Sequence, residues 1–131
     1  KSMKTCIFCH HISEQALLYQ TEHFKLVFDI NPIQTGHLLL ISKDHYTSIS
    51  QLPLPILHEL VETQAHLVGL LEECLPIDGV TIASNDKDLM DDGTHFHIHL
   101  IPRLKGDAFW DQIDIQELPL PIEDFLKELK R

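Results

Sequence analysis

The sequence of 131 residues is poor in the features that mark membrane, secreted and nucleic-acid-binding proteins. No apolar run is long enough to span a bilayer and no signal peptide is visible, so we expect no membrane partner. An odd count of three cysteines without a secretory signal is typical of a cytoplasmic protein. Only 10 Lys and Arg stand against 20 Asp and Glu, and no basic patch offsets this net charge of −10. The charge argues against a nucleic acid polymer as partner.

Hydrophobic residues, by contrast, make up 44% of the sequence, which is enough for the core of a single domain over residues 1–131. Lys1 and Ser2 precede Met3 and are interpreted as a remnant that is not native to the domain. The sequence contains no internal repeat, linker or low-complexity segment.

The predicted elements follow the order strands, helix, strands. Short apolar segments between turn residues predict strands over 16–20, 24–29, 37–42 and 78–85, and a last strand from His95. A period of 3.6 predicts the main helix over 53–74, ended by Pro76, with an apolar face formed by Leu57, Leu60, Val61, Gln64, Val68 and Leu71. A short C-terminal helix is predicted over 122–131, with Phe125 and Leu129 on one side.

Short connections between strands favour antiparallel pairing. The pattern therefore predicts an α+β domain, with an antiparallel meander sheet of about five strands and one main helix packed on it. Strand 37–42 is apolar on both faces and is expected at the centre of the sheet. Cys74, near the end of the helix, is interpreted as an ordinary buried thiol.

Histidine occupies every second position in the segment HFHIHLIPR, residues 95–103. On a strand, alternate side chains share a face, so His95, His97 and His99 would line one face and the intervening apolar residues the core. Pro102 marks the end of the strand or an edge position. At about 3.3 Å per residue, the first and last histidines lie about 13 Å apart, too far to share one metal ion. The row is therefore expected to serve at least two roles.

The residues alone leave several chemistries open. The histidine row could form a catalytic metal site with His95 and His97, supply a nucleophile and phosphate contacts, or face solvent without function. The Cys6-x-x-Cys9 pair could be a redox pair, half of a zinc site or two unrelated thiols. A thioredoxin-like pair requires a βαβ unit, which is not predicted here. Two further zinc ligands could come from one end of the row or from His10, His11, His23, His37 and His45.

The segment from His95 to Ile101 resembles the signature of the histidine triad (HIT) family, in which three histidines alternate with apolar residues and two apolar residues follow. Pro102-Arg103 is the usual continuation. Similar segments are CIFC at 6–9, FDINPIQTGHLLLI at 28–41, SKDH at 42–45 and ASN at 83–85. The resemblance extends from Cys6 to about Trp110 and implies a HIT-like fold.

The resemblance also implies a function. Enzymes of this family are nucleotidyl hydrolases and transferases that act on the α-phosphate of purine nucleoside phosphoramidates, adenylates or dinucleoside polyphosphates. By resemblance, His97 is the nucleophile that forms a nucleotidyl-imidazole intermediate, and the phosphate contacts are His37, Asn85 and His99. The remaining nucleotide contacts implied are Asp29 and Ile30 for the ribose and base, and Phe8, Phe28 and Ile30 as apolar walls.

A zinc-containing bacterial branch of the family accounts for the other end of the row. Its ligands carry over to Cys6, Cys9, His45 and His95, which implies a closed and therefore structural Zn²⁺ site. Relatives usually form two-fold homodimers, so the resemblance implies a homodimer here as well.

The loop before the triad departs from the family pattern. Many members carry a Gly-Gln-Ser/Thr-like run there that touches phosphate, whereas this chain has Asp91 and Asp92. Either these carboxylates face solvent, or they place negative charge beside the phosphate. The departure supports an alternative function, in which the protein is a zinc-stabilised nucleotide-binding module with little or no catalysis.

Overall fold

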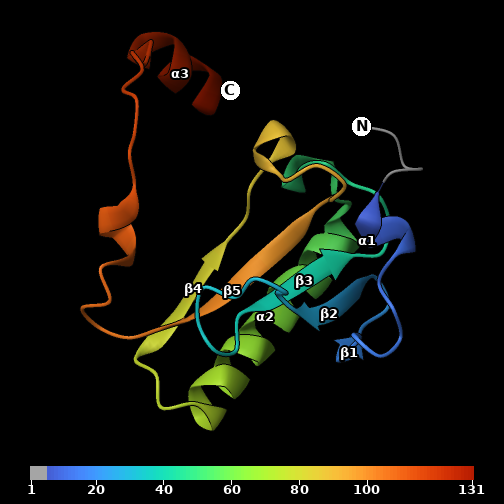
Figure 1. The fold of residues 1–131 in the computed structure, drawn as a ribbon. Coiled ribbons are helices and arrows are strands. Elements are labelled where there is room, and N and C mark those ends of the chain that lie inside the picture. Colours follow the sequence, from blue (N-terminus) through green and yellow to red (C-terminus); the bar gives the residue numbers. More distant parts are fainter. Residues whose placement is uncertain (1–5) are drawn as a thin grey trace.

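A five-stranded antiparallel sheet crossed by one long helix forms the body of the protein in a computed structural model, which describes residues 6–131 (Figure 1). The strands are β1 (Tyr19–Gln20), β2 (Phe24–Phe28), β3 (Leu38–Ser42), β4 (Gly79–Ala83) and β5 (His97–Arg103). The predicted α+β class and antiparallel sheet are confirmed. The interpretation of Lys1 and Ser2 as a remnant concerns residues outside the described ones.

The strand order is β1-β2-β3-β5-β4, so only the first three strands follow one another as a meander. The long helix α2 (Leu54–Cys74) carries the chain across one face of the sheet and places β4 at the edge. The last strand then returns between β3 and β4. Strand β3 is buried at all five positions and lies at the centre, as its apolar sequence predicts.

The last strand separates two environments. Phe96, Ile98 and Leu100 join the core under α2, so His97 and His99 face the opposite side of the sheet. The strand begins at His97 rather than at His95, because the chain bends at Phe96 and the His95 side chain lies against Cys6 of the N-terminal segment. Pro102 lies within the strand, at an edge position: its pairing partner is Val80 of β4, while the pairing with β3 ends at Leu100.

Helix α2 buries one face against the sheet, formed by Ile56, Leu60, Thr63, Leu67 and Leu71. The prediction placed Val61 on this face, and that was wrong: Val61 is 61% exposed, because it lies about 100° around the helix from Leu60. Cys74 was also misassigned, since it is exposed at the last residue of the helix, beyond the last buried position.

A short N-terminal helix and the 3-10 turns were not predicted from sequence, whereas the C-terminal helix was. Helix α1 (Ile7–His10) holds both N-terminal cysteines near the sheet, and 3-10 turns occur at Ile49–Gln51, Lys87–Leu89 and Phe109–Gln112. The C-terminal arm, residues 104–131, runs away from the sheet and ends in α3 (Ile122–Leu129), which confirms the predicted terminal helix (Figure 1). Among the described residues, no helix is long and apolar enough to cross a membrane.

Two glycines allow a matched test of the fold. Gly36 has φ +86°, and a Cβ there would lie 2.8 Å from Leu75 Cδ1. Gly69 lies inside α2 with nothing within 4 Å of such a Cβ. We expect Gly36→Ala to lower the melting temperature, and Gly69→Ala to stabilise the protein by about 1 kcal/mol. Calorimetry of both variants tests this, and shifts in the same direction would contradict the packing described.

Candidate functional site

A cavity of about 480 Å³ opens on the sheet face opposite α2. One wall comes from the N-terminal segment, where Phe8 and Ile12 pack on the small apolar cluster of Val27, Leu39 and Ile41. The other side carries His97 and His99. The size suits a ligand such as a nucleotide, since small-molecule sites span roughly 300–1,000 Å³.

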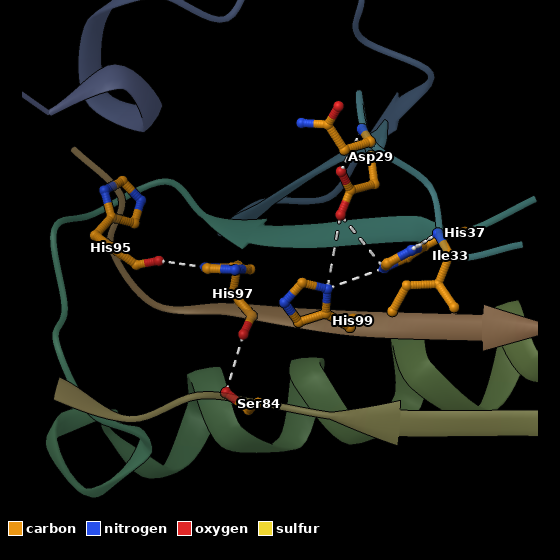
Figure 2. A network of polar contacts seen from close by, with 8 residues as sticks. Asp29, Ile33, His37, Ser84, His95, His97 and His99 are labelled. Carbon is orange, nitrogen blue, oxygen red and sulfur yellow. Dashed lines mark hydrogen bonds and ion pairs between the residues drawn. The ribbon is translucent and has the colours of Figure 1, made fainter. Parts of the chain in front are cut away.

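His97 is held in one tautomer. Its Nδ1 lies 2.7 Å from the carbonyl oxygen of His95, and burial lowers its pKa (Figure 2). The neutral ring must therefore donate Nδ1–H to this carbonyl, which leaves the Nε2 lone pair free. The edge-on ring of Phe8, with centroids 5.0 Å apart, and a 2.9 Å hydrogen bond from Ser84 Oγ to the carbonyl of His97 fix the position further.

A chain of hydrogen bonds sets the tautomer of His99 (Figure 2). The backbone N–H of Ile33 donates to His37 Nδ1 at 3.1 Å, so the neutral His37 carries its proton on Nε2. His37 Nε2 lies 2.9 Å from His99 Nδ1, which accepts this proton's hydrogen bond. The remaining proton of His99 is then on Nε2, as a donor.

Burial keeps both of these histidines neutral. Burial lowers the pKa of His37, and burial together with the neighbouring His97 and His37 lowers the pKa of His99 to about 4. Asp29 Oδ2 lies 3.5 Å from His37 Nε2 and 3.9 Å from His99 Nδ1, and opposes these shifts. The 2.9 Å distance between His37 Nε2 and His99 Nδ1 is that of a direct hydrogen bond between the two rings.

Most of the other residues predicted at the nucleotide site line the cavity, but His37 and Asn85 do not. The structure brings Phe8, Phe28, Asp29, Ile30, Asp91 and Asp92 to the wall or rim of the cavity. His37 is buried behind His99, so its contact to a ligand is indirect. Asn85 is exposed and is not among the residues that line the cavity, and its phosphate contact stays a prediction.

Four possible metal ligands come together just before the bend at Phe96. The ligand atoms of Cys6, Cys9, His45 and His95 all lie within 4.8 Å of one another. Up to 89 positions separate these residues in the sequence. In the fold, Cys6 Sγ and Cys9 Sγ lie 3.2 and 3.4 Å from His95 Nδ1, and Cys9 Sγ lies 3.2 Å from His45 Nδ1. Tetrahedral zinc with Zn–S of about 2.3 Å and Zn–N of about 2.0 Å places sulfur and nitrogen about 3.5 Å apart. The donor set and its spacing fit a closed zinc site.

The hydrogen bonding and burial of His95 suit a neutral zinc ligand. Its Nε2 lies 2.5 Å from the carbonyl oxygen of Ser42 and donates to it, so the Nδ1 lone pair points at the thiols. Burial lowers the pKa of His95 to about 4, which keeps it in the neutral, ligating form. Burial and the adjacent Cys6 raise the pKa of Cys9 to about 11, so the Cys9 thiolate requires a nearby cation.

The other histidines that spacing allowed as ligands lie elsewhere. His10 and His11 are exposed at the end of α1, and His23 forms a 2.8 Å ion pair with Glu59. A catalytic metal held by His95 and His97 does not fit either, because His95 Nδ1 faces the thiols while His97 Nδ1 is hydrogen-bonded to the backbone.

Comparison with known proteins decides the family. The HIT domain model matches residues 11–106. An uncharacterized HIT-like protein of Methanocaldococcus jannaschii is 31% identical over 130 residues, which cover 95% of this chain and 98% of that protein. The chain belongs to the HIT family. A crystal structure of a Zn-bound histidine triad family protein from Mycobacterium smegmatis, 26% identical, matches it with a TM-score of 0.68 over 98% of both chains.

More distant HIT relatives carry the names of nucleotide hydrolases. The adenosine 5′-monophosphoramidase of Saccharomyces cerevisiae is 28% identical over 102 residues, or 75% of this chain and 62% of that protein. The bis(5′-adenosyl)-triphosphatase of Dictyostelium discoideum is 26% identical over 123 residues, or 89% of this chain and 83% of that protein. The HIT family thus includes nucleotide hydrolases.

Several residues of the site could not be found from the sequence. Ile33 and Ser84 act through a backbone N–H and a hydroxyl contact, and neither belongs to a recognisable pattern. The N-terminal wall of the cavity includes Ile7 and Ile12. The Cys-x-x-Cys spacing indicated only that this segment could be attached to the sheet, and did not identify these two residues.

Proposed function

We propose that the protein is a nucleotidyl hydrolase or transferase that acts on the α-phosphate of purine nucleoside phosphoramidates, adenylates or dinucleoside polyphosphates. The observation that supports this most is the hydrogen bond from His97 Nδ1 to the carbonyl of His95. It leaves a neutral imidazole with Nε2 free beside a nucleotide-sized cavity. Such a ring is a competent nucleophile at neutral pH without a separate base.

The reaction proceeds in two displacements. In the first, the Nε2 lone pair of His97 forms a bond to the α-phosphorus while the bond from phosphorus to the leaving atom breaks. The leaving atom keeps the electron pair: an amine nitrogen takes one proton from solvent, whereas a carboxylate or phosphate oxygen leaves as the anion. In the second, a water oxygen bonds to phosphorus, the P–Nε2 bond breaks, and one proton of water passes to Nε2 and then to solvent. The products are the nucleoside monophosphate and the free leaving group.

The surrounding residues position the substrate. The Nε2–H of His99 donates to a phosphate oxygen, since its other nitrogen is occupied by His37. The Asp29 carboxylate accepts from ribose hydroxyls; one of its oxygens already accepts from the backbone N–H of Asn31 at 2.8 Å. The apolar wall formed by Phe8, Phe28 and Ile30 receives the base. Positioning and charge stabilisation are what phosphoryl transfer chiefly requires.

The alternative is a nucleotide-binding HIT domain with little or no catalysis. The observation in its favour is the pair Asp91 and Asp92 at the cavity, where an anionic phosphate must enter. The free Nε2 of His97 supports the enzyme instead, because a binding module has no need of an unprotonated nitrogen at this point.

We further propose that Cys6, Cys9, His45 and His95 hold one structural Zn²⁺ per chain. The spacing of the ligand atoms, the hydrogen bond from His95 to Ser42 and the Zn-bound HIT relative support it. When bound, the ion joins the N-terminal wall of the cavity to the residue that precedes the triad strand. All four positions are filled by protein, so the ion has no open position for chemistry.

We also propose a homodimer joined at strand β4. This strand is at the edge of the sheet, and its five residues, GVTIA, carry no charge or proline that would prevent pairing. Ile82 is 44% exposed there. Antiparallel pairing of β4 with its copy is compatible with a two-fold axis and would extend the sheet across both subunits.

His97→Ala is expected to abolish turnover of adenosine 5′-phosphoramidate, while affinity for adenosine monophosphate stays within about tenfold, because the covalent step needs Nε2. The same change at the exposed His58 on α2, across the sheet, should leave the rate unchanged. Single-turnover kinetics and nucleotide titration of both variants measure this. A His97→Ala protein that keeps even about a tenth of the wild-type rate excludes a histidine nucleophile.

Cys6→Ser is expected to lose the zinc and to lower the melting temperature by about 10 °C or more, because a structural ion contributes several kcal/mol to folding. Cys74→Ser removes an exposed thiol and should retain one zinc per chain. Elemental analysis of protein purified without chelators or metal-affinity resin tests both variants. A wild-type protein that contains no zinc and melts at the same temperature as Cys6→Ser would contradict the site.

Ile82→Lys is expected to convert the dimer to a monomer, because it places a charge at the shared edge. Leu89→Lys, a change at a position that is 75% exposed and outside β4, should leave the dimer intact. Sedimentation velocity of the two variants distinguishes these cases. Equal behaviour of Ile82→Lys and wild type would remove β4 as the interface.

A further inference from the structure

The ring of Phe8 contacts two histidines of the triad at once. Its centroid lies 5.7 Å from that of His95 and 5.0 Å from that of His97, and the ring planes meet at 85° and 90°. Edge-on pairs with centroids about 4.5–7 Å apart are a favourable arrangement of aromatic rings. Phe8 therefore touches both the proposed metal ligand and the proposed nucleophile.

The position of Phe8 is set by its place in the chain, between the two N-terminal cysteines. The thiols of Cys6 and Cys9 lie 3.2 and 3.4 Å from His95 Nδ1. The backbone N–H of Cys9 also donates to Cys6 Sγ at 3.3 Å, which closes the turn that carries Phe8. Because the cysteines hold this turn against His95, the ring of Phe8 is presented to the triad.

The sheet supports the ring from below. Phe8 and Ile12 pack on the apolar cluster of Val27, Leu39 and Ile41. Phe8 is half-buried there, and its remaining surface lines the cavity. One side chain thus connects the cysteine turn, the sheet and the nucleotide cavity.

The hydrogen bond of His97 does not fix the ring completely. The bond from Nδ1–H to the His95 carbonyl restrains one edge of the imidazole. The torsion of a histidine ring about Cβ–Cγ has a broad energy well, so the ring can tilt about this contact. The rings of Phe8 and His99, with centroids 5.0 and 4.9 Å from that of His97, limit the tilt. A small misplacement of an attacking atom lowers the rate of a displacement, so this restraint matters for Nε2.

We propose that Phe8 is a positioning residue for catalysis, whose edge-on ring holds the imidazole of His97 at the tilt that directs Nε2 into the cavity. This inference rests on the proposed function and adds to the apolar wall that Phe8 provides there. No bond forms or breaks at Phe8, which acts only through the orientation of His97. The turn between the two cysteines therefore contributes to the reaction rate as well as to stability.

The kinetic test compares Phe8→Leu with Phe28→Leu in the purified protein. Leucine keeps an apolar wall at both positions and removes the ring, and Phe28 lines the same cavity from strand β2. We expect Phe8→Leu to lower kcat for adenosine 5′-phosphoramidate about threefold to tenfold, with KM within about twofold, because an edge-on aromatic pair changes an equilibrium by about this factor. Phe28→Leu should raise KM instead.

A second measurement follows the nucleophile without substrate. In protein labelled with ¹⁵N-histidine, the exchange of the His97 Nδ1–H proton with water reports how firmly the ring is held. We expect this exchange to be about threefold to tenfold faster in Phe8→Leu. Ile12→Val removes a methylene from the same apolar cluster and should leave the exchange unchanged. Zinc content and melting temperature show whether each variant keeps the cysteine turn; if Phe8→Leu loses zinc, Phe8→Met replaces it, since the flexible methionine fills the gap without a ring.

The outcomes separate this inference from the proposed function. An unchanged kcat in Phe8→Leu, an equal loss of kcat in Phe28→Leu, or equally faster exchange in Ile12→Val overturns the positioning role and leaves the enzyme in place. If wild type does not turn over the phosphoramidate, the proposed function fails. The exchange measurement then decides alone, and equal exchange in wild type and Phe8→Leu overturns the inference as well.

Discussion

The hydrogen bond between His97 Nδ1 and the carbonyl of His95 is the contact on which the candidate site depends. It joins two consecutive histidines of the triad that face different surroundings. The ring of His95 lies between the two thiols and the carbonyl of Ser42, and its backbone carbonyl fixes the proton of His97. The proposed metal site and the proposed nucleophile thus share one residue. Any shift of His95 would be transmitted directly to the tautomer of His97.

The fold supplies this contact through the end of a strand. Strand β3 pairs with β5 up to the partners Ile41 and His97, and the backbone N–H of Ser42 then bonds to the carbonyl of Phe96. The next residue, His95, is released from the ladder and turns to the cysteines of α1. The two remaining histidines of the row stay on the strand, where His37 orients His99 from the neighbouring β3 side. One alternating row therefore serves the two roles that its length predicts.

The alternation of β5, the central position of β3 and the main helix were predictable, because each depends on local hydrophobic periodicity. The return of β5 between β3 and β4 was not, since strand order depends on how α2 crosses the sheet. The misassignment of Val61 came from counting an apolar residue beside the buried face as part of it. The metal ligands were named only through the family resemblance, because spacing alone left six histidine positions open. The indirect place of His37 behind His99 depends on a backbone contact from Ile33 that no sequence pattern encodes.

The central claim is that His97 and His99 are neutral and carry their protons on different nitrogens. Long-range ¹H–¹⁵N correlation spectra of protein labelled with ¹⁵N-histidine measure this directly at pH 7, without substrate. The account predicts that His97 is protonated on Nδ1 with a free Nε2, and that His99 is protonated on Nε2 with Nδ1 accepting from His37. A His97 ring that is protonated on Nε2, either as the other tautomer or as the imidazolium, would contradict it, because the nitrogen assigned to attack phosphorus would have no lone pair.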